Sequence, residues 1–262
     1  MKQISNLFAR ISLGLWAVLM GLILAVPVTV QAAAATSDRQ SPFCANLSTD
    51  VGKVSGPLTS LQAKLNTAQQ DQTQKVTADR AKEDADVQAN RQKWDEDRQT
   101  NFTKLDTKGT TDAQKAAIVT YQNAIKSAVA ARRAAYDAAR TAYRTGLDSV
   151  IASHKNTSGS QVATFADAVN AAIATAQASC AADSSVAASQ TIRSTLMASL
   201  KTARLNFQST RKSDATIGSQ VKQLVQTRNA AFKAADAAFK DSTAAARAAL
   251  KAAFGSQASE VD

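Results

Sequence analysis

Residues 46–65 read NLSTDVGKVSGPLTSLQAKL, and their apolar residues recur at alternating steps of three and four. The positions are Leu47, Val51, Val54, Leu58, Leu61 and Leu65. This spacing is the heptad pattern of a helix that packs one apolar seam against a neighbouring helix. Gly56 and Pro57 interrupt the stretch without shifting its register, which favours a kink over a helix end. The pattern therefore predicts one long helix.

The same periodicity extends over most of the chain and predicts four helices. Ser41 followed by Pro42 is typical of a helix start, because serine caps the first amides and proline suits the first turn. We expect helices over 42–106, 112–154, 161–181 and 189–254, with a softer point at Ser213-Asp214 in the last one. At 1.5 Å per residue the first and last helices are ~97 and ~99 Å long, and the two middle helices sum to ~95 Å.

These matched lengths predict an all-α fold, an elongated antiparallel helical bundle or coiled coil over 41–255. In the favoured topology three legs run up, down and up, and the middle leg is broken into two helices at 156–159. The alternative is a four-helix up-down bundle. The chain has only 9 glycines and 3 prolines, too few turn residues for a many-stranded barrel or sandwich.

The two cysteines favour the three-legged topology. Cys44 lies at the start of the first helix and Cys180 at the end of the third, so three legs bring both to the same end. In the four-helix alternative Cys180 would lie ~30 Å away, which is out of disulfide reach. We therefore expect a Cys44–Cys180 disulfide, the alternative being two separately buried thiols.

The first 32 residues have the order of an export signal. Lys2 and Arg10 precede an uncharged apolar run over 11–26, and small residues follow Pro27. We expect cleavage after Ala32, followed by a disordered leader at 33–40 and, at the other end, a disordered tail at 256–262. The alternative is an uncleaved membrane anchor, since roughly 20 apolar residues span a bilayer.

A weak internal repeat has the form R-x-A-A-aromatic-x-A-A-x-x-A-aromatic. It occurs at 132–143 and again at 228–239. Arg132 and Arg228 open the two copies one helical turn before Tyr136 and Phe232. We expect these arginines to stack on the rings or to extend to the rim. The alternative is that they contact an anionic ligand.

Sequence motifs give no sign of catalysis, a cofactor site or a metal site. The chain has 1 histidine and 2 cysteines, which excludes most sites built from those residues. His154 is expected to cap the C-terminus of the second helix, where a cation is favourable. Asp95, Glu96 and Asp97 follow Trp94 on a helix and are interpreted as solvated charge without a fixed basic partner. The sequence predicts a protein that is not an enzyme.

The net charge and the distribution of charged residues indicate which kinds of partner to expect. The net charge is +10, from 31 basic and 21 acidic residues. Basic proteins associate with polyanions, but here the basic residues are interleaved with acids along the helices, as on a solvated helical surface. We expect protein partners or anionic envelope polymers, no specific nucleic acid, and membrane contact only through an uncleaved N-terminal segment.

With Phe43-Cys44, Trp94-Asp95 and the two R-x-A-A-aromatic segments, the chain resembles alanine-rich, exported coiled-coil proteins of bacteria. That resemblance implies no known activity, ligand or catalytic residue. The chain is also broadly similar to basic periplasmic holdase chaperones with helical arms, although it lacks their β-rich assembly core.

The expected function is that of an exported, non-enzymatic spacer or interaction rod in the cell envelope, in the periplasm, at the cell surface or secreted. The alternative is a basic binding module for polyanions, or a holdase-like chaperone for exported clients.

Overall fold

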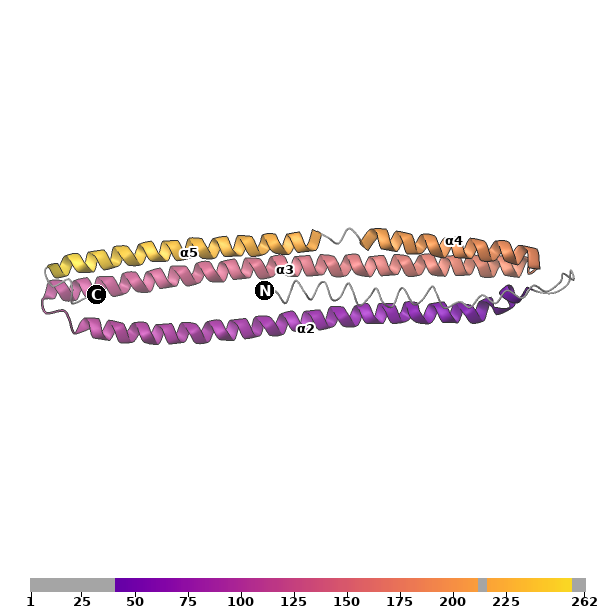
Figure 1. The fold of residues 1–262 in the computed structure, drawn as a ribbon. Coiled ribbons are helices and arrows are strands. Elements are labelled where there is room, and N and C mark those ends of the chain that lie inside the picture. Colours follow the sequence, from indigo (N-terminus) through magenta and orange to yellow (C-terminus); the bar gives the residue numbers. More distant parts are fainter. Residues whose placement is uncertain (1–40, 212–215, 256–262) are drawn as a thin grey trace. The chain divides into compact units, whose positions relative to one another are not determined.

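A computed structural model describes residues 41–211 and 216–255, and within these ranges the chain forms four helices and no strand. The helices are α2 (Pro42–Asp106), α3 (Asp112–Ala182), α4 (Val186–Arg211) and α5 (Thr216–Phe254), as Figure 1 shows. The all-α class is confirmed. The predicted signal peptide, leader and tail, and the soft point at Ser213-Asp214, lie outside the described residues. None of the described helices is long and apolar enough to span a membrane.

Helix α2 begins and ends at the predicted residues, Pro42 and Asp106. Ser41 caps it, because its side-chain oxygen accepts a hydrogen bond from the backbone amide of Phe43 at 3.3 Å. Pro57 lies inside the helix, so the prediction that the Gly56-Pro57 step does not end it is confirmed. The heptad residues Leu58, Leu61 and Leu65 are buried.

The predicted break in the middle leg at 156–159 is wrong, because α3 is a single helix of 71 residues. The polar run there resembles a loop, but its side chains bind α2. Ser158 accepts a hydrogen bond from Gln69 at 3.3 Å, and Lys155 donates one to Thr73 at 2.6 Å. These contacts offset the helix-weakening effect of Gly159, which is about 1 kcal/mol relative to alanine.

Two further predictions that depend on this break are also wrong. The four-helix up-down alternative is wrong, because it requires the chain to reverse within α3. His154 does not cap a helix terminus, since α3 continues past it to Ala182.

The predicted break after the third expected helix is confirmed. α3 ends at Ala182 and α4 begins at Val186. Asp183 accepts a hydrogen bond from the amide of Ser185 at 2.9 Å, and Ser185 Oγ accepts one from the amide of Ala188 at 3.3 Å. The bond from Ser185 also lowers the pKa of Asp183. The helix expected over 189–254 is described as two helices, α4 and α5.

The chain divides into two compact units. Among the described residues, unit 1 comprises 41–74, 152–211 and 216–218, and unit 2 comprises 75–151 and 219–255. Helices α2 and α3 contribute one segment to each unit, while α4 belongs to unit 1 and nearly all of α5 to unit 2. Each unit therefore contains three helical segments.

Unit 1 has an apolar core to which all three of its helices contribute. Its buried members are Leu58, Leu61, Leu65, Val162, Phe165, Val169, Ile173, Ala203 and Phe207. The rings of Phe165 and Phe207 lie 5.1 Å apart, which joins α3 to α4. Gln161 of α3 also donates to the carbonyl of Thr210. Residue numbers rise along one helix as they fall along the other, so α3 and α4 are antiparallel.

A disulfide closes one end of unit 1. Cys44 of α2 and Cys180 of α3 are bonded, with their Cα atoms 5.5 Å apart, as the sequence predicted. The Ser189 hydroxyl of α4 lies 3.3 Å from Cys44 Sγ, and the amide of Ser41 donates to the carbonyl of Ser184 at 3.0 Å. One covalent bond and two polar contacts thus join α2 to both neighbouring segments. Such a bond fits an oxidising compartment.

In unit 2 the apolar core is smaller. Ile118 is 1% exposed and packs with Leu250 and Phe254 of α5, and Leu105 and Tyr121 border this cluster. Elsewhere in the unit α3 approaches α5 closely at a glycine. A Cβ atom at Gly146 would lie 2.5 Å from Leu224 Cδ2, so the absence of a side chain allows this approach.

A short hydrogen-bonded connection joins α2 to α3 in unit 2. The side-chain oxygen of Gln114, which is buried, accepts hydrogen bonds from the amides of Thr110 and Thr111 at 3.0 and 3.2 Å. In return, Thr111 Oγ1 accepts one from the amide of Gln114 at 3.2 Å. This reciprocal capping box fixes the start of α3.

We predict that replacing Cys180 with serine destabilises unit 1. The bond joins residues separated by 136 positions, and restriction of the unfolded chain over such a loop is worth at most roughly 4–5 kcal/mol. Thermal unfolding followed by circular dichroism should show a lower midpoint for Cys180→Ser. Reductant should lower the wild-type midpoint to a similar value and leave the variant unchanged. If both cysteines react with an alkylating agent in protein prepared without reductant, the prediction is contradicted.

Candidate functional site

In unit 2, charged side chains line the contact between α2 and α3. Four bidentate guanidinium–carboxylate pairs cross it, with nitrogen–oxygen distances of 2.6–3.0 Å: Arg80–Asp148, Asp84–Arg144, Arg91–Asp137 and Asp95–Arg133. We call these four pairs the charge ladder. The residue numbers rise along α2 as they fall along α3, so the two segments are antiparallel.

The ladder follows from one spacing that occurs twice in the sequence. Residues 80–95 and 133–148 both have the form R-x3-D-x6-R-x3-D. When two such segments lie antiparallel, every arginine of one meets an aspartate of the other. Apolar periodicity does not reveal this motif, whereas the spacing of charges in the two segments does.

The arginines of the ladder are more deeply placed than their partners. The side chain of Arg144 is 21% exposed and that of Asp84 is 55% exposed. Two guanidiniums also reach backbone oxygens of the opposite helix, Arg80 that of Arg144 and Arg133 that of Arg91, each at 3.3 Å. The long aliphatic stems thus cover the helix surfaces where apolar side chains are scarce.

Asp95 has fixed basic partners, so its interpretation as solvated charge is wrong. Its Oδ1 atom lies 2.6 Å from Arg133 Nη2 and 2.5 Å from Arg98 Nη2. The hydrogen bonds from Arg133, followed by that from Arg98, lower the pKa of Asp95 from 3.8 to about 2 against the opposing effect of burial. Arg133 lies on α3, so the sequence of α2 alone does not reveal this partner.

Asp137 occupies the equivalent place on α3. It accepts two hydrogen bonds from Arg91, at 2.6 and 3.0 Å, and lies 3.5 Å from Arg140 Nη1. The segments R-x2-W-D-x2-R at 91–98 and R-x2-Y-D-x2-R at 133–140 therefore form two related triads. In each triad one carboxylate is shared by two guanidiniums, and in the second triad Arg140 also pairs with Glu83 at 3.3 Å.

The contact between α3 and α5 uses the internal repeat at 132–143 and 228–239. The rings of Tyr136 and Phe232 stack with centroids 4.2 Å apart. On one side of this pair, the Arg132 guanidinium lies 5.0 Å from the Phe239 ring. On the other side, the Arg228 guanidinium lies 4.7 Å from the Tyr143 ring. The two copies therefore pack antiparallel around the central stack. Each arginine also lies over the ring that it was predicted to contact, Arg132 at 5.3 Å from Tyr136 and Arg228 at 5.7 Å from Phe232, so the predicted stacking is confirmed.

The polar groups of these arginines also have protein partners. Arg132 pairs with Asp236 at 2.7 Å, and Asp236 accepts a further hydrogen bond from Tyr136 at 2.8 Å. The bonds from Tyr136 and then Arg132 lower the pKa of Asp236. Arg228 donates to the side-chain oxygen of Asn229 at 3.0 Å. The alternative role of Arg132 and Arg228 as anion contacts stays a prediction.

A cavity of about 380 Å³ lies among α2, α3 and α5 of unit 2. Its lining combines apolar and cationic side chains: Val87, Asn90, Arg91, Trp94, Arg98, Ile125, Val129, Arg132, Arg133, Tyr136, Arg140 and Phe239. We call it the arginine cavity. Of the two predicted anion contacts it includes Arg132 and not Arg228. Trp94 is 56% exposed, so its ring lines the cavity and also faces solvent.

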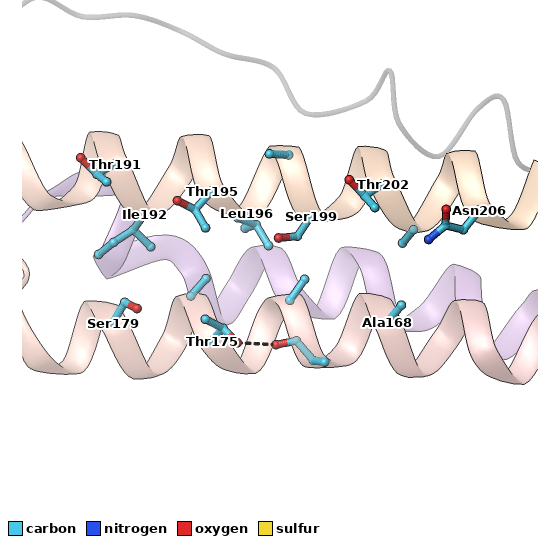
Figure 2. Close-up of a pocket in the computed structure, with 15 residues that line it drawn as sticks. Ala168, Thr175, Ser179, Thr191, Ile192, Thr195, Leu196, Ser199, Thr202 and Asn206 are labelled. Atoms are coloured by element: carbon cyan, nitrogen blue, oxygen red, sulfur yellow. Dashed lines mark hydrogen bonds between the residues drawn. The ribbon is translucent and has the colours of Figure 1, made fainter.

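Unit 1 has a different hollow, a groove of about 600 Å³ between α3 and α4. Figure 2 shows Thr191, Thr195 and Ser199 of α4 opposite Thr175 and Ser179 of α3. Most lining residues are alanine, serine or threonine, and the Thr175 hydroxyl donates to its own helix at the carbonyl of Ala171. Small side chains account for this groove, and none of the described residues that line it is charged. The arginine cavity is therefore the stronger candidate site.

Comparison with known proteins gave no match to a family model, to a curated protein or to a solved structure.

We predict that the charge ladder determines the stability of unit 2 through pairing rather than through either charge alone. Arg80→Asp and Asp148→Arg each place like charges opposite one another, and each should lower the unfolding free energy by ~1 kcal/mol. The double variant restores opposite charges and should recover at least half of the combined loss. Urea unfolding followed by circular dichroism measures all three, with the exposed Arg247→Asp of α5 as a control. Losses that simply add in the double variant would contradict pairing.

We predict that the Asp95 pairing makes unit 2 sensitive to acid. Because the folded pKa of about 2 lies below the unfolded value of 3.8, the contribution is complete above pH 3.8 and is lost as the pH falls toward 2. Asp95→Asn should therefore show a smaller loss of unfolding free energy over that interval than the wild type.

The matched control for this prediction is Asp97→Asn, which is exposed on the same helix and should keep the wild-type dependence. Carboxyl-carbon NMR should give a titration midpoint for Asp95 well below 3.8. A midpoint at or above that value would count against the pairing.

Proposed function

We propose that the protein is exported and acts, without enzymatic activity, as a structural spacer or interaction rod in the cell envelope. The observation that carries the proposal is the set of ties between long helices. α2 and α3 have 65 and 71 residues, or contour lengths of ~97 and ~107 Å. Within unit 2 the charge ladder fixes their register, and within unit 1 the disulfide joins them.

Three features support this role. The Cys44–Cys180 bond fits an oxidising compartment, and the apolar run at 11–26 supports export. Most charged groups of the site bind groups on the neighbouring helix, a use that maintains helix pairing. The interleaving of acids and bases gives a hydrophilic exterior suited to weak, replaceable contacts with envelope components.

The test distinguishes a function that needs the pairing of α2 and α3 from one that needs a particular side chain. In a host lacking the gene, we expect envelope resistance to detergent to be restored by the wild type and by the paired Arg80→Asp/Asp148→Arg variant. Either single variant should restore less, because the helix pairing is weakened. The exposed Arg247→Asp serves as the control and should restore fully. Equal restoration by both single variants would overturn a role that depends on the scaffold.

A second measurement addresses the alternative functions. Binding of the purified full chain to polyphosphate that weakens steeply between 50 and 200 mM salt would favour the polyanion-binding module instead. Suppression of the aggregation of an unfolded client at stoichiometric concentration would favour the holdase. A spacer should show neither effect, and recovery of the protein in the cytoplasm with reduced cysteines would overturn export.

A further inference from the structure

The arginine cavity combines two chemistries that protein interiors usually separate. Aromatic and aliphatic side chains come from three helices, among them Trp94 of α2, Ile125 of α3 and Phe239 of α5. Five guanidiniums join them, those of Arg91, Arg98, Arg132, Arg133 and Arg140. Among the described residues no carboxylate lines the cavity, although carboxylates pair with these arginines from outside the lining. A ligand inside would therefore meet apolar surface and positive charge.

The positive charges are only partly neutralised by the protein. Asp95 is shared by Arg98 and Arg133, and Asp137 by Arg91 and Arg140. Glu83, the other acid that contacts Arg140, is also shared, with Arg144. A guanidinium that shares its carboxylate keeps donors for a further acceptor, since it has five N–H groups.

Arg140 has an N–H donor that the described part of the protein leaves unsatisfied. Its side chain is 16% exposed, and its Nε atom is buried without a hydrogen-bond partner among the described residues. Glu83 Oε1 lies 3.3 Å away, which is an ion-pair distance, but the N–H is not directed to it. Arg140 therefore keeps a donor that no described protein group accepts, and the same side chain lines the cavity.

We propose that the arginine cavity binds a single-chain anionic amphiphile, an organic carboxylate with an apolar tail. A volume of about 380 Å³ lies in the range of small-molecule sites. The carboxylate would take donors from the Arg140 side of the cavity, and the tail would contact Trp94, Val129 and the neighbouring apolar residues. Guanidinium suits such a head group because it binds carboxylates in bidentate geometry. This binding role is separate from the scaffold role.

The chain supplies its own probe for the test. It has 2 tryptophans, Trp16 and Trp94, so Trp16→Phe in the full chain leaves Trp94 as the single reporter at the cavity. Titration with decanoate below its micellar concentration should shift Trp94 emission to shorter wavelength and saturate. Acetate offers the head group alone and 1-decanol the tail alone, and each should bind at least tenfold more weakly. Equal binding of decanoate and 1-decanol would overturn the proposal.

Two variants in the Trp16→Phe background locate the site. Arg140→Gln removes the donor, and Val129→Phe fills the cavity while retaining every charge. Both should weaken decanoate binding about tenfold, whereas Arg247→Gln, exposed on α5, should leave it unchanged. Circular dichroism checks that each variant is folded, and Val129→Phe decides the result if Arg140→Gln unfolds.

Wild-type affinity in the Val129→Phe variant would overturn the proposal. Binding to an anionic membrane surface, whose head group is a phosphodiester and not a carboxylate, is tested with vesicles of phosphatidylglycerol. A Trp94 shift on vesicles that persists in Val129→Phe would show binding to a membrane surface instead and would also overturn it.

Discussion

The pairing of guanidinium and carboxylate across α2 and α3 determines the register of unit 2. A bidentate pair tolerates little displacement, because both oxygens must lie in the plane of the two donors. Four such pairs along two helices match at one register, and a shift by one residue breaks all of them. Individual pairs at an exposed surface contribute at most about 1 kcal/mol. The ladder therefore contributes specificity of alignment, while the small cluster around Ile118 contributes apolar burial.

This constraint explains the unusual sequence of α3 in unit 2. Adjacent residues serve different neighbours: Arg132 and Tyr136 contact α5, while Arg133 and Asp137 contact α2. Two motifs are thus interleaved along one helix, each repeated on the helix it faces. The surrounding alanines keep the backbones close enough for these long side chains to reach across. The arginine cavity lies where the two motifs meet, which is why guanidiniums and aromatic rings line it together.

The sequence predicted the fold well where a residue's structural role depends only on its neighbours in the sequence. Ser41-Pro42 located the start of α2, the leucine heptads located part of its core, and the cysteine positions identified a bond. Local meaning misled at 156–159, since a polar run with a glycine is typical of a loop unless partners on another helix bind it. The role of Asp95 and the arginine cavity depended in the same way on residues distant in sequence.

The repeated charge spacing also bears on how the chain selects its partner. Segments 80–95 and 133–148 carry the same order of charges. Either segment, aligned antiparallel with a second copy of itself, would therefore also pair every arginine with an aspartate. Charge order alone does not distinguish pairing within a chain from exchange between two chains. The connection at 107–111 makes that distinction, because a short linker holds its two segments at an effective concentration on the order of millimolar. The turn built around Thr111 and Gln114, outside both charged segments, therefore favours pairing within one chain over pairing between two chains.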